Sequence, residues 1–127
     1  MKIVRIVALA LTAALFSAPL TASPAAASAG ANYQLTLVRN GIPKTATLTC
    51  APDGGTHPNP AAACARLAPA LGNPASIQPK QGVMCIALYD PVTATATGVW
   101  FGRPISYTRT FTNTCWLSVA TWEVFAF

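Results

Sequence analysis

Four cysteines in a short chain constrain this fold more than any other feature of the sequence. They are Cys50, Cys64, Cys85 and Cys115. An even number of cysteines in a small exported protein indicates disulfide bonds, and four cysteines allow three pairings. A domain of this size buries only a modest core, so two bridges of roughly 3 kcal/mol each would matter to its stability. The spacing of the cysteines does not choose among the pairings.

The start of the chain has the three-part pattern of a secretory signal peptide. Lys2 and Arg5 supply the positive charge, and an apolar run over residues 6–16 follows. That run is too short to span a bilayer, which takes roughly 20 residues. Two A-x-A triplets, at residues 25–27 and 27–29, are candidate cleavage sites. We expect cleavage near residue 27 or 29, and export of the rest of the chain.

We therefore divide the chain into a signal peptide over residues 1–29 and a single domain over residues 30–127. The whole chain has a net charge of +5, and removal of Lys2 and Arg5 lowers it to +3. The remaining basic residues are scattered, whereas nucleic-acid binding needs a clustered basic patch. We expect no nucleic-acid partner, and no membrane partner once the signal is removed.

Alternating polar and apolar residues predict strands, and prolines and glycines mark the connections. Residues 32–39 alternate and predict a strand, Asn40-Gly41 predicts a turn, and residues 46–49 predict a second strand. Residues 51–60 contain three prolines and two glycines and predict a loop.

The best helix candidate is residues 61–71. Asn59 is a suitable N-cap for it, and Pro60 suits the first helical position. Pro69 should end or kink this helix near Ala68, because proline cannot continue the hydrogen-bond pattern.

The second half of the chain predicts more strands than helices. Residues 92–97 are rich in Thr and Val and predict a strand, and residues 99–111 predict a hairpin-like pair or a bent strand. Residues 116–122 predict a short helix. By periodicity alone the apolar run 83–89, which Asp90-Pro91 ends, favours a buried core strand. The sum is an α+β fold, with an antiparallel sheet of about five strands, one or two short helices on one face and two disulfides.

Side chains that commonly carry chemistry are few and scattered. His57 is the only histidine and there is no C-x-x-C pair, so the cysteines do not resemble a zinc site. His57 also lies in a loop without a G-x-S-x-G turn, and the acids Asp53, Asp90 and Glu123 are widely spaced. We expect a binding module with no metal, cofactor or catalytic residue, in which His57 is a structural hydrogen-bonding group.

Several short motifs, in a fixed order, resemble the Streptomyces subtilisin inhibitor family of secreted serine protease inhibitors. They are T-L-T-C-A-P (47–52), G-T-H-P (55–58), A-C-A-R-L (63–67), V-M-C-I-A-L-Y-D-P-V (83–92), G-V-W-F-G (98–102), S-Y-T-R-T-F-T-N-T-C (106–115) and the terminal V-F-A-F. With the four cysteines, the resemblance covers nearly all of residues 33–127. It implies an inhibitor, not an enzyme, whose reactive loop binds a serine endopeptidase as a substrate does.

The resemblance also implies residue roles. It implies the disulfides Cys50–Cys64 and Cys85–Cys115, and a scissile bond two residues after the cysteine of the reactive loop, Ala87–Leu88. The other loop residues expected to contact the protease are Met84, Cys85, Ile86 and Tyr89. The side chain of Asn113 is expected to brace the loop, and a homodimer with packed sheet faces is implied.

Two residues depart from the family pattern or limit the target. Ile86 stands where the family commonly has proline, which removes some rigidity from the loop. Ala87 carries no positive charge, so we expect a subtilisin-like or elastase-like protease as partner and not a trypsin-like one. Met84 adds apolar contact in a subsite that subtilisins favour.

An alternative role is an exported transglutaminase substrate or structural protein on the same fold. Three glutamines and two lysines of the mature chain are the candidate acceptors and donors. They are Gln34, Gln78, Gln81, Lys44 and Lys80.

Overall fold

The computed structural model describes residues 13–19 and 29–127. Four antiparallel strands form one sheet in the order β2-β1-β3-β4. They are β1 (Ala31–Arg39), β2 (Ile42–Cys50), β3 (Val92–Trp100) and β4 (Arg103–Phe111). Residues 13–19 contain no helix or strand. Most of the predicted signal peptide lies outside the described residues.

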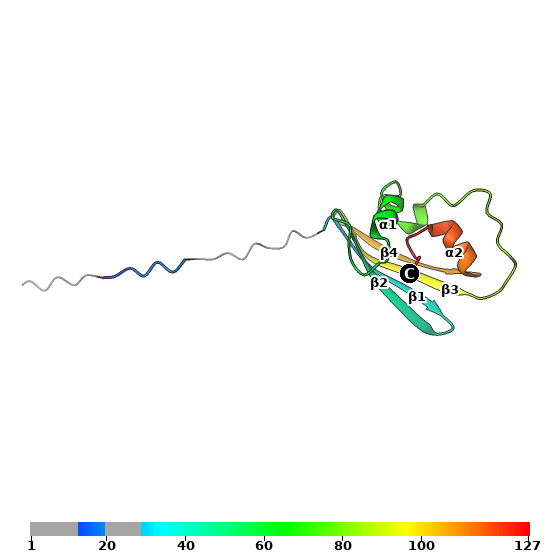
Figure 1. Ribbon diagram of the computed structural model, residues 1–127, viewed down its shortest axis with the longest axis horizontal. Helices are drawn as coiled ribbons and strands as arrows, with labels where there is room; N and C mark the ends of the chain where they lie inside the picture. The colour runs from blue at the N-terminus through cyan, green and yellow to red at the C-terminus, as the bar shows by residue number, and fades with distance from the viewer. Residues whose placement is uncertain (1–12, 20–28) are drawn as a thin grey trace, which may run out of the picture.

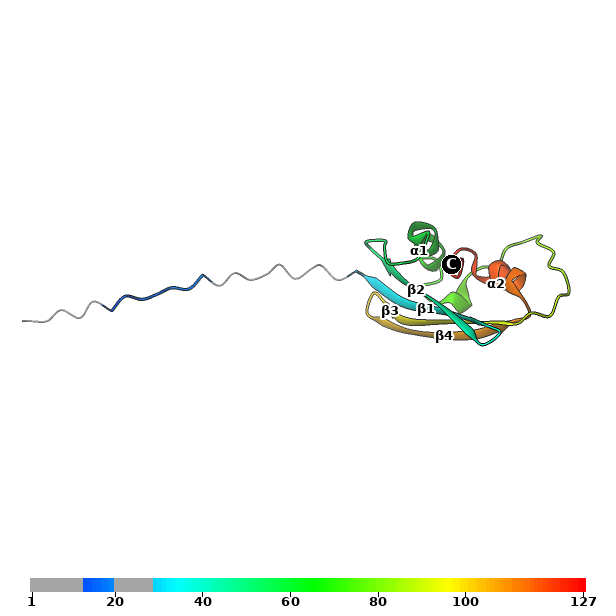
Figure 2. The ribbon, with the colours of Figure 1, turned by 60° about the horizontal axis from the view of Figure 1, so that its bottom comes forward.

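The helices lie on one face of the sheet, as Figures 1 and 2 show. They are α1 (Pro60–Leu67), the short 3₁₀ helix η1 (Pro74–Ser76) and α2 (Thr114–Thr121). The α+β fold predicted from the sequence is confirmed. In the described part of the chain, no helix is both long enough and apolar enough to cross a membrane.

The turn between β1 and β2 is the predicted Asn40-Gly41 turn. Both residues have positive φ, 53° and 72°, which suits the twist of a two-residue hairpin. This turn pairs Arg39 directly with Ile42, so β2 begins earlier than the sequence predicts. Pro43 then lies on an edge strand, where its missing N–H does not interrupt a ladder.

Strand β3 shows how the sheet separates its two faces. Ala94 and Ala96 are fully buried under the helices, while Thr93 and Thr95 lie on the opposite face. The small alanine side chains let the helical layer approach the sheet closely. Alternation along the strand therefore gives one packed face and one threonine-rich face.

Both α-helices begin at an asparagine cap. Asn59 Oδ1 accepts a hydrogen bond from the Ala62 N–H at 3.4 Å, and Pro60 is the first helical residue, as predicted. Helix α1 ends at Leu67, before Pro69. Asn113 caps α2, and this helix starts slightly earlier than the sequence predicts.

The core lies between the sheet and the helices and includes the end of the chain. Its largest fully buried side chains are Leu35, Leu48, Leu67, Val92, Val124 and Thr121. Phe125 is only 3% exposed, and Phe127 packs against the core from its edge. His57 is also buried, and its Nε2 lies 3.0 Å and 3.1 Å from the carbonyl oxygens of Glu123 and Val124. A structural role for His57 fits these contacts.

Two sequence predictions about strands are wrong. The sheet described has four strands and not five, because residues 99 and 100 continue β3 and do not start a separate strand. The apolar run 83–89 is not a buried core strand. Its backbone pairs with no strand, and Cys85 is held against α2, which keeps the run outside the sheet.

Candidate functional site: the exposed loop

Residues 79–91, here called the exposed loop, connect η1 to β3 and project beyond the helices at one end of the sheet (Figure 1). Apolar side chains on this loop face solvent. Met84 is 93% exposed, Tyr89 80%, Ile86 74% and Leu88 53%, and Ala87 is exposed as well. A contiguous exposed apolar patch on a small protein typically marks a surface that binds another molecule.

A disulfide between Cys85 and Cys115 ties the middle of the exposed loop to the first turn of α2. The second disulfide, Cys50–Cys64, ties the end of β2 to α1. In both, the Cα atoms are 5.7 Å apart. Both bonds are those implied by the family resemblance. They attach the two long irregular segments of the domain to its helices.

Asn113 connects the exposed loop to α2 through both polar atoms of its side chain, Nδ2 and Oδ1. Its Nδ2 donates to the carbonyl oxygens of Ile86 at 3.2 Å and Leu88 at 2.8 Å, and its Oδ1 accepts from the Trp116 N–H at 3.1 Å. The side chain is buried, so water competes little with these bonds. The two carbonyl groups lie on either side of Ala87. One rigid amide thus holds the backbone around this residue and leaves the loop side chains outside.

The end of the exposed loop is fixed to β1 and to the residue that follows β4. The Asp90 N–H donates to the Thr112 carbonyl at 2.9 Å, and the Asp90 carboxylate forms an ion pair with Arg39 at the end of β1. Mainly through its hydrogen bond, Arg39 holds the pKa of Asp90 below its ordinary value. Sequence reasoning missed this pair. The β1–β3 register, which places Arg39 opposite Val92, brings Arg39 and Asp90 together, and the sequence does not display that register.

The start of the exposed loop is fixed at Lys80. Its backbone N–H donates to the Val119 carbonyl at 2.8 Å, and its ammonium donates to Ser118 Oγ at 2.9 Å. Within the described structure, the backbone of residues 81–84 makes no hydrogen bond to the rest of the domain. The loop is therefore anchored at its two ends and at its middle, with one free stretch before Cys85.

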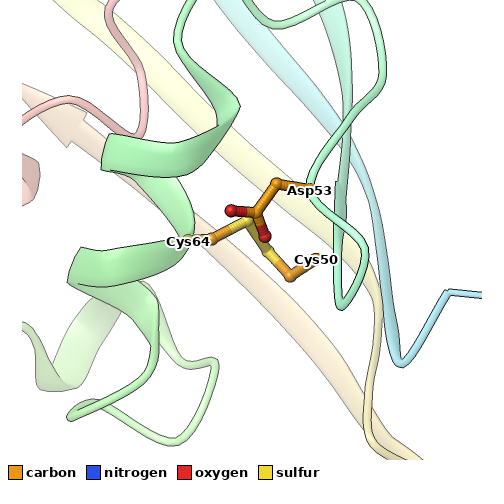
Figure 3. A group of neighbouring side chains, drawn as sticks. All are labelled: Cys50, Asp53 and Cys64. Carbon is orange, nitrogen blue, oxygen red and sulfur yellow. A yellow bond between two sulfur atoms is a disulfide. The ribbon is translucent and has the colours of Figure 1, made fainter.

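The acidic residues of the domain lie beside a disulfide or beside arginines. Figure 3 shows Asp53 beside Cys50 and Cys64, but the two sulfur atoms are bonded to each other. A cysteine binds a metal as a thiolate, and the sulfur atoms of this disulfide are not thiolates, so the group is a disulfide with a neighbouring carboxylate. The acids Asp90 and Glu123 each form an ion pair with an arginine.

Comparison with known proteins identifies the family of this domain. The sequence model of the subtilisin inhibitor-like family matches residues 18–113. A subtilase-type protease inhibitor of Streptomyces coelicolor is 48% identical over 85 residues, which are 66% of this chain and 59% of that protein. The matched region thus spans less than two thirds of that relative. A trypsin inhibitor of Streptomyces longisporus is 42% identical over 94% of this chain and 93% of its own length.

A solved structure supports the same assignment. It is Streptomyces caespitosus sermetstatin in complex with Bacillus licheniformis subtilisin, with 32% sequence identity and a TM-score of 0.59. The superposition covers 76% of this chain and 98% of sermetstatin. The relatives from Streptomyces coelicolor and Streptomyces longisporus are both named as inhibitors and not as enzymes. Sequence match and fold agree, and the chain belongs to the subtilisin inhibitor-like family.

Proposed function

We propose that this protein inhibits subtilisin-like serine endopeptidases by presenting the exposed loop as a bound substrate, with Ala87–Leu88 as the bond offered for cleavage. The observation that carries the proposal is the Asn113 amide, which hydrogen-bonds the carbonyl groups of Ile86 and Leu88 on either side of Ala87. The side chains of the same residues are exposed and free to enter the pockets of a protease.

Preorganisation of the loop favours tight binding. A protease binds an extended segment through main-chain hydrogen bonds and through side chains that occupy its subsites. A loop already held in place loses less conformational entropy on binding than a free peptide does. Ala87 enters the primary pocket, Met84 and Ile86 occupy the subsites before it, and Leu88 and Tyr89 lie beyond the bond. Cys85 keeps its disulfide.

The same anchors explain why cleavage would not release the protease quickly. If the Ala87–Leu88 bond is cut, Asn113 still holds Ile86 on one side and Leu88 on the other. The new amine and the acyl-enzyme carbonyl remain adjacent, so religation competes with hydrolysis at high effective concentration. The cleaved inhibitor then leaves the protease as slowly as the intact inhibitor does.

The side chain of Ala87 favours a subtilisin-like target. The family alone does not decide this point, because the relative from Streptomyces longisporus is named a trypsin inhibitor. Trypsin binds a cation in its primary pocket, and Ala87 offers none. The bond from Asn113 to the Ile86 carbonyl also supplies part of the rigidity that a proline at this position would give.

Titration of the purified mature protein against subtilisin tests this function. We expect stoichiometric inhibition, with mass spectrometry after long incubation showing slow cleavage only between Ala87 and Leu88. Substitution Ala87→Lys should move inhibition toward trypsin, while Ala87→Asp should abolish inhibition with the fold intact. Rapid degradation of the wild-type loop, or stronger inhibition of trypsin than of subtilisin, would contradict the proposal.

The threonine-rich face of the sheet supports a homodimer. By strand register its residues come from alternate positions of all four strands, and none of them is charged. They are Asn32, Gln34, Thr36, Val38, Pro43, Thr45, Thr47, Thr49, Thr93, Thr95, Thr97, Val99, Pro104, Ser106, Thr108 and Thr110. The core of a protein interface is typically depleted in charge. Sedimentation equilibrium should give a dimer, and Thr95→Arg should give a monomer that still inhibits. A wild-type monomer at micromolar concentration would remove this part of the proposal.

The mature protein is secreted after removal of residues 1–29, and residues 30–127 form the inhibitor domain. The signal-like start of the chain supports this division. N-terminal sequencing of the exported protein should begin within a residue or two of Ser28 or Gly30. The inhibitor names of the relatives favour inhibition over the alternative role as a transglutaminase substrate or structural protein.

A further inference from the structure

A cluster at the end of α2 holds the segment that enters the exposed loop. At its centre is the indole of Trp122, which two cations approach. The guanidinium carbon of Arg66, on α1, lies 3.5 Å from the ring centroid, and the ammonium of Lys80 lies 5.2 Å from it. Both distances fall within the range in which a cation is attracted to an aromatic ring.

Hydrogen bonds in this cluster fix the backbone on both sides of residue 79. The Trp122 Nε1–H donates to the Gln78 carbonyl at 2.8 Å. Lys80 makes the two bonds already described, from its backbone N–H to Val119 and from its ammonium to Ser118. The ring of Trp122 therefore contacts the ammonium of Lys80, and its indole N–H binds the carbonyl of Gln78 in the same segment.

The position of Trp122 is itself determined by its surroundings. Its φ is 52°, which is uncommon for a residue other than glycine and persists only where contacts enforce it. Its N–H donates to the Ser118 carbonyl at 2.9 Å. Next to it, Glu123 Oε2 accepts from Arg66 Nε at 3.1 Å, which ties the guanidinium to the same end of α2.

We propose that Arg66, Gln78, Lys80, Ser118 and Trp122, here called the upstream anchor, form a positioning device for the exposed loop. With Lys80 fixed, only residues 81–84 span the distance to the disulfide-tied Cys85. Without this anchor the free segment begins near Ile77, which is buried. A longer free segment has more conformations to lose on binding.

The residue most affected is Met84, which precedes Cys85 and is almost fully exposed. The upstream anchor limits where the Met84 side chain can lie relative to Ala87. This inference rests on the proposed inhibition of subtilisin, because it assigns Met84 to a protease subsite. No residue of the upstream anchor needs to touch the protease.

Lys80→Met and Trp122→Phe test the device. Lys80→Met removes the ammonium but keeps the aliphatic stem, and Trp122→Phe keeps a ring for Arg66 but loses the N–H to Gln78. We expect each to raise the inhibition constant for subtilisin about 3- to 10-fold and to speed cleavage of Ala87–Leu88, with thermal unfolding followed in parallel. Lys80→Arg, which keeps a cation and a donor, should restore most of the affinity. Lys44→Met, on the exposed part of β2, is the matched control and should change neither value.

A double-mutant cycle separates positioning from simple stabilisation of the fold. In the wild type, Met84→Ala should weaken inhibition clearly, and in the Trp122→Phe background it should weaken inhibition much less. Additive effects, or unchanged inhibition by the variants of the upstream anchor, would overturn this inference while leaving the proposed function in place. Failure of the wild-type protein to inhibit subtilisin would instead overturn the proposed function.

Discussion

Two irregular loops of this domain use the same kind of covalent tie in opposite ways. The inner loop, residues 51–59, is closed by Cys50–Cys64, and the exposed loop is held by Cys85–Cys115. The inner loop is bonded to β2 through its backbone, and it also buries a side chain: His57 is buried, and its ring is hydrogen-bonded at both nitrogens. Around Ala87 the exposed loop buries no side chain, and it is held there through the carbonyl groups that Asn113 binds.

The difference shows what a binding loop requires. A loop anchored by an inward-facing side chain adds to the core, as His57 does beside Phe127, with ring centroids 5.9 Å apart. A loop anchored by its carbonyl groups keeps its side chains for a partner. Both loops are held by backbone hydrogen bonds, whereas the burial of their side chains differs. A loop that buries a side chain stabilises the fold, and a loop that keeps its side chains exposed can bind another protein.

Removing one disulfide at a time should produce the largest difference between the two loops, in inhibition for the exposed loop and in stability for the inner loop. The double substitution Cys85→Ser and Cys115→Ser should raise the inhibition constant for subtilisin at least about 100-fold and make the loop a good substrate, since the loop loses its central tether. Cys50→Ser with Cys64→Ser should cost about 3 kcal/mol of unfolding free energy but change the inhibition constant little, when assayed below the lowered melting temperature. Equal losses of inhibition in the two variants would contradict the comparison.

Asn113→Asp should separate loop support from helix capping. The carboxylate keeps the acceptor for the Trp116 N–H at the start of α2, but it removes both donors to the loop. We expect inhibition to weaken about 10- to 100-fold with helical circular dichroism close to wild type, and the melting temperature to fall because the new carboxylate is buried beside two carbonyl oxygens. Asn113→Ala should lose both the cap and the loop contacts. Strong inhibition by Asn113→Asp would show that the bonds to Ile86 and Leu88 are not needed.

Glycines in the two loops should respond differently to alanine. At Gly55, with φ of 95°, a Cβ would lie 2.4 Å from the Thr47 carbonyl oxygen, so Gly55→Ala should cost roughly 3 kcal/mol or more of unfolding free energy. At Gly82, with φ of 70°, a Cβ would meet no atom within 4 Å. Gly82→Ala should therefore cost only the conformational strain of about 1–2 kcal/mol. Urea denaturation measures both, and a larger cost at Gly82 would contradict this account.

The ion pair at the end of the exposed loop should give the smallest effect, and one that depends on pH. Because Arg39 lowers the pKa of Asp90 from its ordinary 3.8, the pair stabilises the folded state above that value. This contribution is lost as the pH falls through the folded-state pKa of Asp90. The difference in unfolding free energy between wild type and Asp90→Asn should thus be largest near neutral pH and vanish toward about pH 2. A difference that does not change with pH would argue against the ion pair.

Much of the fold follows from signals within a few residues of each other. Asn59-Pro60 starts α1, Pro69 limits its length, and Asn40-Gly41 makes the β1–β2 turn. The number of strands was harder to predict, because the side chains of Val99 and Trp100 suit both a new strand and an extension of β3. Whether they start a new strand or extend β3 depends on pairing with β1, which the sequence does not display.

The site was predicted in part. The family resemblance implied both disulfides and the bracing role of Asn113, and the structure contains those bonds and the hydrogen bonds from Asn113. The reactive bond Ala87–Leu88 stays a prediction. The anchors at Lys80 and Arg39 were missed, because their partners at Ser118 and Asp90 lie 38 and 51 residues away along the chain.

Local chemistry in the sequence was thus enough for the turns, the helix starts and the alternating strand β3, since each depends on backbone preferences or on which face a side chain takes. It could not decide whether the apolar run 83–89 is buried or exposed, because such a run suits a core strand and a binding loop equally well. That choice depends on contacts between distant residues. Cys115 and Asn113 hold the run against α2, away from the sheet, and the hydrogen bonds to its carbonyl groups leave its apolar side chains in solvent.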